Sequence, residues 1–427
     1  MTAEIAVLNR QGVALAADSA VTVSGAAGTK VYNSANKLFV LSKVAPVGVM
    51  VYGNGQLTGV PWETVIKVYR GRLGARRFPH LADYASDLLG FLDKRNDLFP
   101  RQQQEMELLS TFSDYCTNVI LTELDTQVAQ HLTRSPISRT QVGVITDNTI
   151  VSHARAWNKR KYLPERTNSH VRRVMSRWSS EIDAVIRDVF KQLSLTAISR
   201  NRLHRLAGLL FAKDRFPEGG LSGLVVAGFG EQEHFPAVVS YGVEGVVLER
   251  LKYRLEVQSA IDHHRSAAII PFAQREMVSL FMEGIDPGLL ETMRTALETV
   301  ITDLPSMIAG GLALSAANKA AVTRQLAAAG KVLPKTLTEA LRQDSRVRYV
   351  NPIVATVASL PKEELATMAE TLVNLTSFKR RLTPERETVG GPIDVAVISK
   401  GDGFVWMKRK HYFDPGLNQR FMAQYGR

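Results

Sequence analysis

The sequence has few of the residues that stabilise extracellular proteins or span membranes. Cys116 is the only cysteine among 427 residues, so no disulfide can form within the chain. The longest apolar runs, such as VGVMVY at 47–52, are far too short to cross a bilayer. The N-terminus lacks the basic start and apolar stretch of a secretory signal. We therefore expect a cytoplasmic protein with no membrane-spanning segment.

Patterns for metal or phosphate binding are also weak. His263 and His264 are adjacent, so they would point in different directions on a helix, and no third ligand stands nearby. The segment GFGEQE at 228–233 has glycines but neither the lysine nor the flanking pattern of a phosphate-binding loop. We expect no metal ion and no cofactor.

Charge of one sign is in excess, because the formal net charge is +12. The stretch RAWNKRKYLPERTNSHVRRVMSRW at 155–178 is strongly basic and has Trp157, Tyr162 and Trp178 interleaved. Such a stretch can follow a phosphate backbone while its aromatic rings stack on bases. A solvated charged helix explains the same pattern, so nucleic-acid binding stays open as an alternative function.

The remaining sequence predicts a globular α+β protein. Hydrophobic residues make up 45% of the chain and charged residues 22%, which is ordinary for a folded domain. Strand-like segments and helical segments come in runs, which favours antiparallel sheets covered by helices over a regularly alternating fold. The core strands are predicted at about 2–55, 221–257 and 391–413, with a helical insertion at 61–213 and a helical region at 262–379. We treat 1–427 as one domain, with a short hairpin predicted within 133–152.

The first residues, MTAEIAVLNRQGVALAADS, predict two short strands. Ile5 and Val7, then Val13, Leu15 and Ala17, are spaced as the buried side of these strands. The residues Asn9, Arg10, Gln11 and Gly12 between them predict a hairpin turn. If Met1 is removed, Thr2 becomes an N-terminal residue held at a sheet edge.

This opening resembles the start of proteasome β-type subunits and of the related bacterial threonine peptidases, which are N-terminal nucleophile hydrolases. The resemblance is carried by Thr2, by Asp18 in AADS, by Lys37 in SANKLFVL and by Gly53 in VYGNG, with Gly55 as a second candidate for that glycine. The later segments GLVVAGFG and GGPIDVAVISKGDG are similar to family strands in the same order. The resemblance implies a four-layer αββα sandwich interrupted by the two helical segments.

The resemblance also implies a mechanism for amide or peptide hydrolysis. Thr2 would be the nucleophile, and its free α-amine would be the base after Met1 is removed. Lys37 would lower the pKa of that amine, Asp18 would hold Lys37, and the Gly53 N–H would face the oxyanion. Peptide or protein substrates, a homo-oligomer such as a ring, and an ATP-dependent unfoldase are the partners implied.

One departure from the family pattern favours a different function. The family often has an Asp and a Ser shortly before its late Gly-Gly pair, whereas Arg386 and Val389 occupy those positions before Gly390 and Gly391. The first alternative is therefore a non-catalytic scaffold or regulatory subunit with the same fold.

Overall fold

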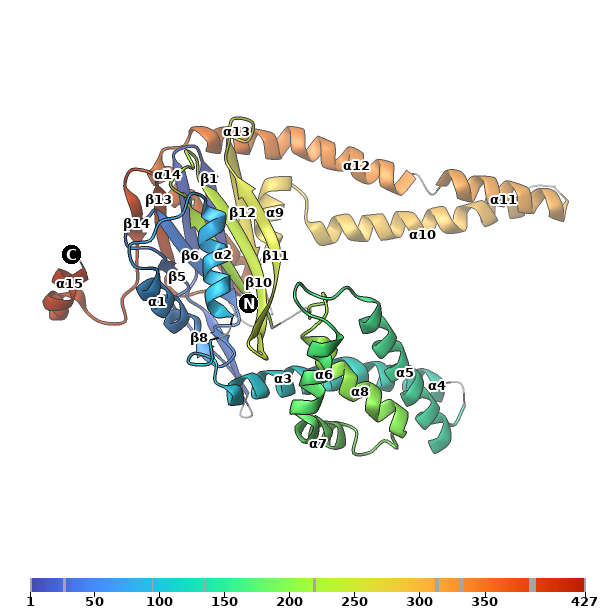
Figure 1. Cartoon of the computed structure of the whole chain (residues 1–427). Coiled ribbons are helices and arrows are strands. Elements are labelled where there is room, and N and C mark those ends of the chain that lie inside the picture. Colours follow the sequence, from blue (N-terminus) through green and yellow to red (C-terminus); the bar gives the residue numbers. More distant parts are fainter. Residues whose placement is uncertain are drawn as a thin grey trace.

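Two five-stranded antiparallel sheets form the centre of the molecule (Figure 1). The computed structural model describes residues 2–25, 28–93, 95–133, 135–217, 220–311, 315–330, 333–383 and 389–425. Within these ranges the predicted α+β class with antiparallel sheets is confirmed. No helix in the same ranges is both long enough and apolar enough to cross a membrane.

The strand order of both sheets brings distant segments together. The first sheet has the order β12 (Ala267–Ala273), β1 (Ala3–Asn9), β2 (Gly12–Ala17), β13 (Asp394–Ser399) and β14 (Gly403–Lys408). The second has the order β11 (Arg250–Ala260), β10 (Ala237–Val247), β9 (Ser222–Gly228), β6 (Val47–Gly53) and β5 (Leu38–Val40). Two small ribbons accompany them, β3 (Val21–Gly25) with β4 (Gly28–Tyr32), and β7 (Gln56–Leu57) with β8 (Val60–Pro61). The chain passes from the first sheet to the second through β3 and β4.

The predicted β1–β2 hairpin is present, but its apolar residues do not share one face. Ile5 and Val7 pack toward helices, whereas Val13, Leu15 and Ala17 pack in the core cluster that joins the two sheets. Every residue of both strands is buried, because one face meets helices and the other meets the second sheet. The Asn9 side chain closes the turn by accepting a hydrogen bond from Gln11 N at 2.9 Å.

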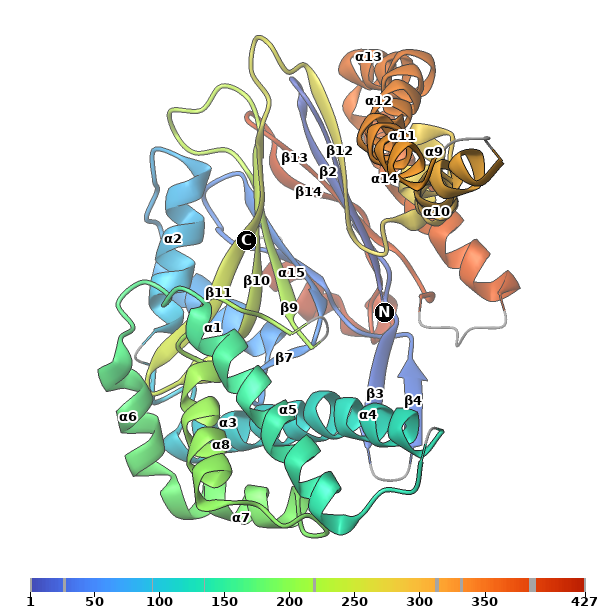
Figure 2. The ribbon, with the colours of Figure 1, turned by 90° about the vertical axis from the view of Figure 1, so that its right-hand side faces the viewer.

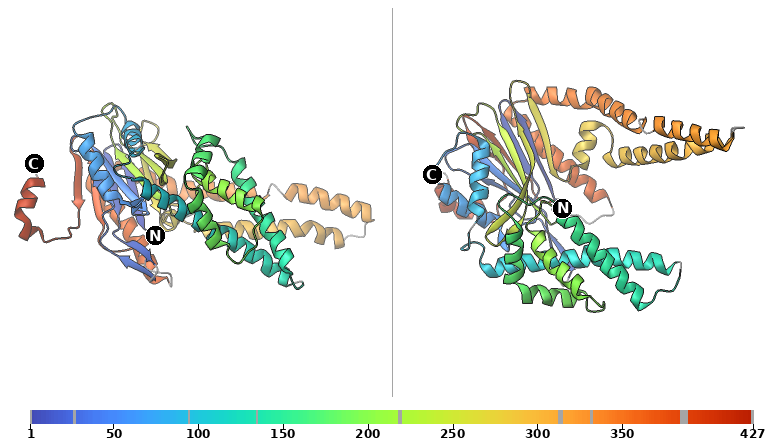
Figure 3. Two further views of the ribbon diagram at one scale, coloured as in Figure 1. Left: turned by 60° about the horizontal axis from the view of Figure 1, so that its bottom comes forward. Right: turned by 45° about the vertical axis from the view of Figure 1, so that its right-hand side comes forward.

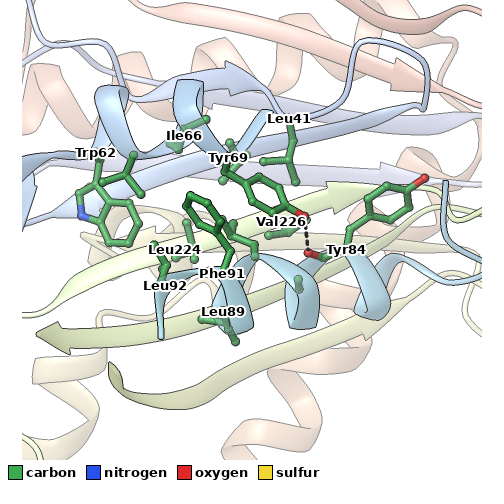
Figure 4. Packing of buried hydrophobic residues seen from close by; sticks show 14 of the residues in the cluster. Leu41, Trp62, Ile66, Tyr69, Tyr84, Leu89, Phe91, Leu92, Leu224 and Val226 are labelled. Carbon is green, nitrogen blue, oxygen red and sulfur yellow. Dashed lines mark hydrogen bonds between the residues drawn. The ribbon is translucent and has the colours of Figure 1, made fainter. Parts of the chain in front are cut away.

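Two helices, α1 (Trp62–Leu73) and α2 (Leu81–Leu92), cover the outer face of the second sheet. Figure 4 shows Trp62, Ile66 and Tyr69 of α1 and Phe91 of α2 meeting strand residues such as Val226. The Tyr69 and Phe91 rings pack edge to face with centroids 5.3 Å apart. These helices therefore belong to the same core as the sheet.

The following helices form a group with its own apolar core (Figure 2). They are α3 (Arg101–Tyr115), the π-helix η1 (Cys116–Leu121), α4 (Thr122–Leu132), α5 (Arg139–Lys159), α6 (Asn168–Arg177), α7 (Ser179–Val189) and α8 (Ala197–Leu210). The hairpin predicted within 133–152 is wrong, because α5 occupies most of that segment. The sequence contains the reason, since Ser138 and Gln141 form a capping box that starts α5.

The region predicted as helical at 262–379 begins with a strand, which corrects that boundary. Residues 267–273 form β12, an edge strand paired with β1. The helices that follow are α9 (Glu276–Glu283), α10 (Pro287–Gly311), α11 (Ala316–Gly330), α12 (Leu333–Ser345), the π-helix η2 (Arg346–Val350), α13 (Asn351–Ser359) and α14 (Lys362–Leu382). Helices α13 and α14 cover the outer face of the first sheet, and α10–α12 project away from it (Figure 3).

The chain ends with η3 (Pro415–Asn418) and α15 (Gln419–Tyr425), beyond β14. The start of β1 lies at the end of the sheets that faces the α3–α8 group (Figures 1 and 2).

Candidate functional site

The β1–β2 hairpin brings Thr2 and Asp18 together. Thr2 precedes β1 and Asp18 follows β2, and Glu4 pairs with Ala17 across the ladder. Asp18 N donates to Ala3 O at 3.1 Å, and Ala3 N donates to Asp18 Oδ1 at 3.1 Å. The Thr2 side chain therefore lies beside the Asp18 carboxylate, with Thr2 Oγ1 3.1 Å from Asp18 Oδ1.

Main-chain donors from two further segments fix the Asp18 carboxylate. Its Oδ2 accepts from Ala20 N at 3.2 Å and from Gly390 N at 2.9 Å. The second bond joins the site to the segment just before β13. With Ala3 N on its other oxygen, this fully buried carboxylate has three backbone N–H partners, which leaves it little freedom to move.

Lys37 reaches the same place from the second sheet. It stands directly before β5, where its carbonyl accepts from Val51 N at 2.8 Å. Its Nζ lies 2.6 Å from Thr2 Oγ1 and 2.5 Å from Asp18 Oδ1. The three side chains predicted from the sequence as nucleophile, lysine and aspartate are thus brought into contact, between the two sheets.

Glu4 is a fourth member of this cluster that the sequence analysis missed. Thr2 Oγ1 donates a hydrogen bond to Glu4 Oε1, and Lys37 Nζ lies 3.3 Å from the same oxygen. Glu4 Oε2 is buried, and within the part of the chain that the structure describes it has no hydrogen-bond partner. Burial raises the pKa of Glu4 to about 8, although Lys37 opposes this effect. The sequence contains one indication of this role. Glu4 alternates with Ala6 and Leu8 on one face of β1, and these two residues pack in the apolar core between the sheets.

These four side chains make Thr2 Oγ1 a candidate nucleophile. Its single hydrogen faces two carboxylates, Glu4 and Asp18, while the Lys37 ammonium donates to the oxygen itself. A carboxylate can accept the hydroxyl proton, and the ammonium stabilises the negative charge that develops on oxygen. The low exposure of all four, at most 7%, strengthens these interactions relative to water.

Gly53 lies at the end of β6, opposite Ser222 of β9. Its φ is +78°, and a Cβ placed there would lie 2.2 Å from Leu221 O, so the backbone requires glycine at this position. No hydrogen bond among the described residues joins Gly53 to Thr2. A Cβ on the second candidate, Gly55, would lie 4.0 Å from the Val21 side chain, three residues after Asp18. The oxyanion role predicted for Gly53 stays a prediction.

The sequence analysis also selected Met1, Arg386, Val389 and the basic stretch at 155–178. Met1 and Arg386 lie outside the described residues, while Val389 is buried among apolar side chains. In the basic stretch, Trp157 and Trp178 are buried in the core of the α3–α8 group, and Lys213 Nζ lies 3.5 Å from the Tyr162 ring centroid. Neither tryptophan is therefore available to stack on nucleic-acid bases. The described ranges contain no group of three His, Cys, Asp or Glu side chains that could hold a metal ion.

The comparisons with known proteins do not show a family. No protein-family model and no curated protein matches the chain. Among solved structures, it is similar to Anbu (ancestral beta-subunit) from Yersinia bercovieri, with 10% identity, 99% of this chain and 97% of that chain covered, and a TM-score of 0.28. A Gly-1 mutant of Anbu from Hyphomicrobium sp. strain MC1 has 10% identity, 99% and 94% coverage, and a TM-score of 0.23.

These findings correct the sequence-based assignment. The chain resembles proteasome β-type subunits in a few short motifs, but assigning it to that family is wrong on these comparisons, since no family model or curated protein supports the assignment. The two structural similarities are too weak to carry an argument about fold or function. The case for a function therefore comes from the geometry of the cluster itself.

Proposed function

We propose that this protein hydrolyses amide bonds, in particular peptide bonds, with Thr2 as the nucleophile. The observation that carries the proposal is the contact of Thr2 Oγ1 with the Lys37 ammonium at 2.6 Å and with two carboxylates. A hydroxyl needs both a proton acceptor and a positive charge close by to attack a carbonyl at neutral pH. The α-amine that removal of Met1 exposes is the acceptor that the sequence suggests, and a carboxylate of the cluster is the other.

The layers around the cluster support a structural proposal as well. We propose a single domain built as a four-layer αββα sandwich, with α1 and α2 on one side and α13 and α14 on the other. The apolar clusters on the two outer sheet faces and between the sheets support this layering. The α3–α8 group and the α10–α12 projection are then insertions.

The test is covalent labelling of the purified protein with a peptide vinyl sulfone, followed by intact mass and peptide mapping. We expect one adduct, on Thr2, and none on the Thr2→Ala variant. Thr146→Ala is the matched control, because Thr146 is also buried but its hydroxyl donates to Val142 O within α5. Labelling elsewhere, or none at all, would refute the proposal and favour the non-catalytic scaffold.

The same mass measurement reports the state of the N-terminus. We expect Met1 to be absent, because Thr2 is small enough for ordinary methionine removal and an α-amine base requires it. An N-terminal peptide that still carries Met1 in protein labelled on Thr2 would rule out the α-amine as the base.

We also propose self-association. Large apolar side chains on α10 are exposed, among them Leu289, Val300 and Met307, and a second copy of the chain would cover them. Light scattering across a tenfold concentration range should give a mass above that of one 47.1 kDa chain. A constant monomer mass would contradict this. A ring and an unfoldase partner were implied by the family resemblance alone and are not proposed. Nucleic-acid binding is not proposed either, because the two tryptophans of the basic stretch are buried and cannot stack on bases.

A further inference from the structure

We propose that Glu4 is a catalytic residue of this site, which takes the proton from Thr2 Oγ1 and returns it to the leaving amine. The inference rests on the proposed function, since it assumes that Thr2 is the nucleophile. It assigns the proton acceptor to a side chain that no part of the sequence analysis had selected.

The other hydrogen-bond partners distinguish Glu4 from Asp18, the second carboxylate at Thr2. The Thr2 hydroxyl is within hydrogen-bond contact of both Glu4 Oε1 and Asp18 Oδ1. Asp18 already holds three backbone N–H groups and the Lys37 ammonium. Glu4 Oε2 has no hydrogen-bond partner among the described residues. The carboxylate with spare acceptor capacity, and in direct contact with the nucleophile, is Glu4.

The geometry of a strand by itself places the Glu4 side chain beside that of Thr2. Thr2 and Glu4 are two residues apart at the start of a strand, so their side chains point to the same face. On that face the neighbours of Glu4 within β1 are apolar, because Ala6 and Leu8 pack between the sheets. A carboxyl group in such surroundings needs a function or a partner, since burying it costs several kcal/mol, on the order of its lost hydration.

Two charged side chains face Glu4, and they come from different segments of the chain. Lys37 arrives from the segment before β5, and Asp18 follows β2. On the other side, the residue that pairs with Glu4 is Phe272 of β12, which is apolar. The amine at the start of the chain also lowers the pKa of Glu4. The proton on Glu4 changes the charge of this side-chain cluster by one unit.

The proposed step balances in protons and electrons. The Thr2 Oγ1–H bond breaks, its proton moves to Glu4 Oε1, and Oγ1 forms a bond to the substrate carbonyl carbon. The carbonyl electron pair moves onto oxygen, and the Lys37 ammonium remains beside Oγ1. When the intermediate collapses, the C–N bond breaks and Glu4 gives the proton to the leaving nitrogen. Water then attacks the ester with Glu4 again accepting a proton, and Thr2 regains its hydrogen.

The pH dependence follows from the state of Glu4. Only the ionised form accepts a proton, and the pKa of Glu4 is raised to about 8. Activity that depends on Glu4 should therefore increase as the pH rises toward about 8 and level off above it. A residue that merely holds Thr2 in place would not produce this limb.

The experiment measures the rate of Thr2 labelling by a peptide vinyl sulfone between pH 5.5 and 9.5. Wild type is compared with Glu4→Gln, which keeps the size and an acceptor oxygen but cannot take a proton. We expect Glu4→Gln to be slower by about 10²-fold or more at pH 8, with the limb near pH 8 lost. Glu4→Asp should keep a pH-dependent limb and recover part of the rate, even if the glutamine variant folds poorly. Glu107→Gln is the control, because Glu107 is another mostly buried carboxyl whose pKa is raised, to about 7, and it has no contact with Thr2.

The outcomes separate the two proposals. If wild type is not labelled on Thr2 at any pH, the proposed function fails and this inference falls with it. If wild type is labelled and Glu4→Gln matches it in rate and pH profile, only the role of Glu4 is overturned. A Glu4→Gln variant that is slower but keeps the wild-type pH profile also overturns it, because Glu4 would then act through position alone.

Discussion

Two clusters of charged side chains in this protein have a similar composition but differ in the other partners of their lysine. The first lies between the sheets and contains Lys37, Asp18 and Glu4. The second lies where the β10–β11 hairpin meets the α3–α8 group, and contains Lys252 and Glu244, with Glu107 from α3 close to Glu244. Each has one buried lysine and two carboxyl groups; Glu4 and Asp18 are buried, whereas Glu107 and Glu244 are half-buried.

The difference is in the other partners of the lysine. Lys252 Nζ donates to the main-chain oxygens of Leu210 and Arg215, at 2.5 and 2.8 Å, and lies 4.6 Å from the Phe216 ring centroid. Burial lowers the pKa of Lys252 and raises that of Glu244, with each partly offsetting the other. Lys37, in contrast, donates to a hydroxyl oxygen near the start of the chain. A buried lysine–carboxylate pair is therefore no sign of catalysis by itself, and the hydroxyl makes the first cluster a candidate site.

The two clusters should differ most in how the loss of their lysine affects the rate of Thr2 labelling. Lys37→Met should slow Thr2 labelling by about 10³-fold, which is about 4 kcal/mol of barrier, because the positive charge beside Oγ1 is lost. Lys252→Met, which removes the lysine of the other cluster, should leave the labelling rate unchanged. Intact-mass kinetics on both folded variants measures this. Equal losses in the two variants would mean that the lysine acts on stability only.

Stability should show the opposite ranking. Lys252→Met leaves two main-chain carbonyls and the Glu244 carboxylate without their ammonium partner, so we expect the free energy of unfolding to fall by about 3 kcal/mol. Lys37→Met orphans no main-chain group, and Glu4 takes up a proton readily, so the expected fall is about 1 kcal/mol. Urea unfolding followed by circular dichroism measures both. A larger loss of unfolding free energy for Lys37→Met would argue that the first cluster mainly stabilises the fold.

The sequence predicts part of this comparison and misses the rest for identifiable reasons. Thr2, Asp18 and Lys37 were found because short motifs stand around them. Glu4 was missed because one glutamate in an apolar strand looks like a solvent-facing residue until the second sheet is seen to cover it. Lys252 was missed for the same reason. It is buried by a separate group of helices, and the residues of β11 alone do not indicate that these helices cover it.

Two secondary-structure errors have similar physical origins. Strand β12 falls within the segment predicted as helical at 262–379. It contains Pro271, which an edge strand tolerates because one side of it has no ladder to satisfy. A short hairpin was predicted within 133–152, whereas the capping box at Ser138 and the packing of α5 against α8 favour a helix. In both segments the structure follows a feature that the sequence analysis did not use, which is pairing with β1 for β12 and the capping box for α5.

The pH dependence of stability offers a smaller and more specific contrast. A carboxyl group whose pKa is raised in the folded state stabilises the fold when protonated, and this contribution is lost as the pH rises toward the folded-state pKa. With Glu4 raised from 4.5 to about 8, we expect wild type to lose about 2 kcal/mol more than Glu4→Gln between pH 6 and 8. Glu107, raised to about 7, should complete its own loss about one pH unit lower. Denaturation at several pH values measures both, and an identical pH profile for Glu4→Gln and wild type would contradict the expectation.

The smallest expected effect tests whether Asp18 and Lys37 act as one unit. Both contact Thr2 Oγ1 and each other, so Asp18→Asn and Lys37→Met should each disable much the same interaction. In labelling kinetics, the double variant should lose less than the sum of the single losses, by about 1 kcal/mol or more. Lys37→Met combined with Glu107→Gln is the control pair, since the two residues share no partner, and it should be additive within about 0.5 kcal/mol. Additive losses for Asp18 and Lys37 would mean that Asp18 holds the chain in place through its three backbone N–H bonds alone, independently of the lysine. The cluster would then resemble the one at Lys252, where the charges hold elements together.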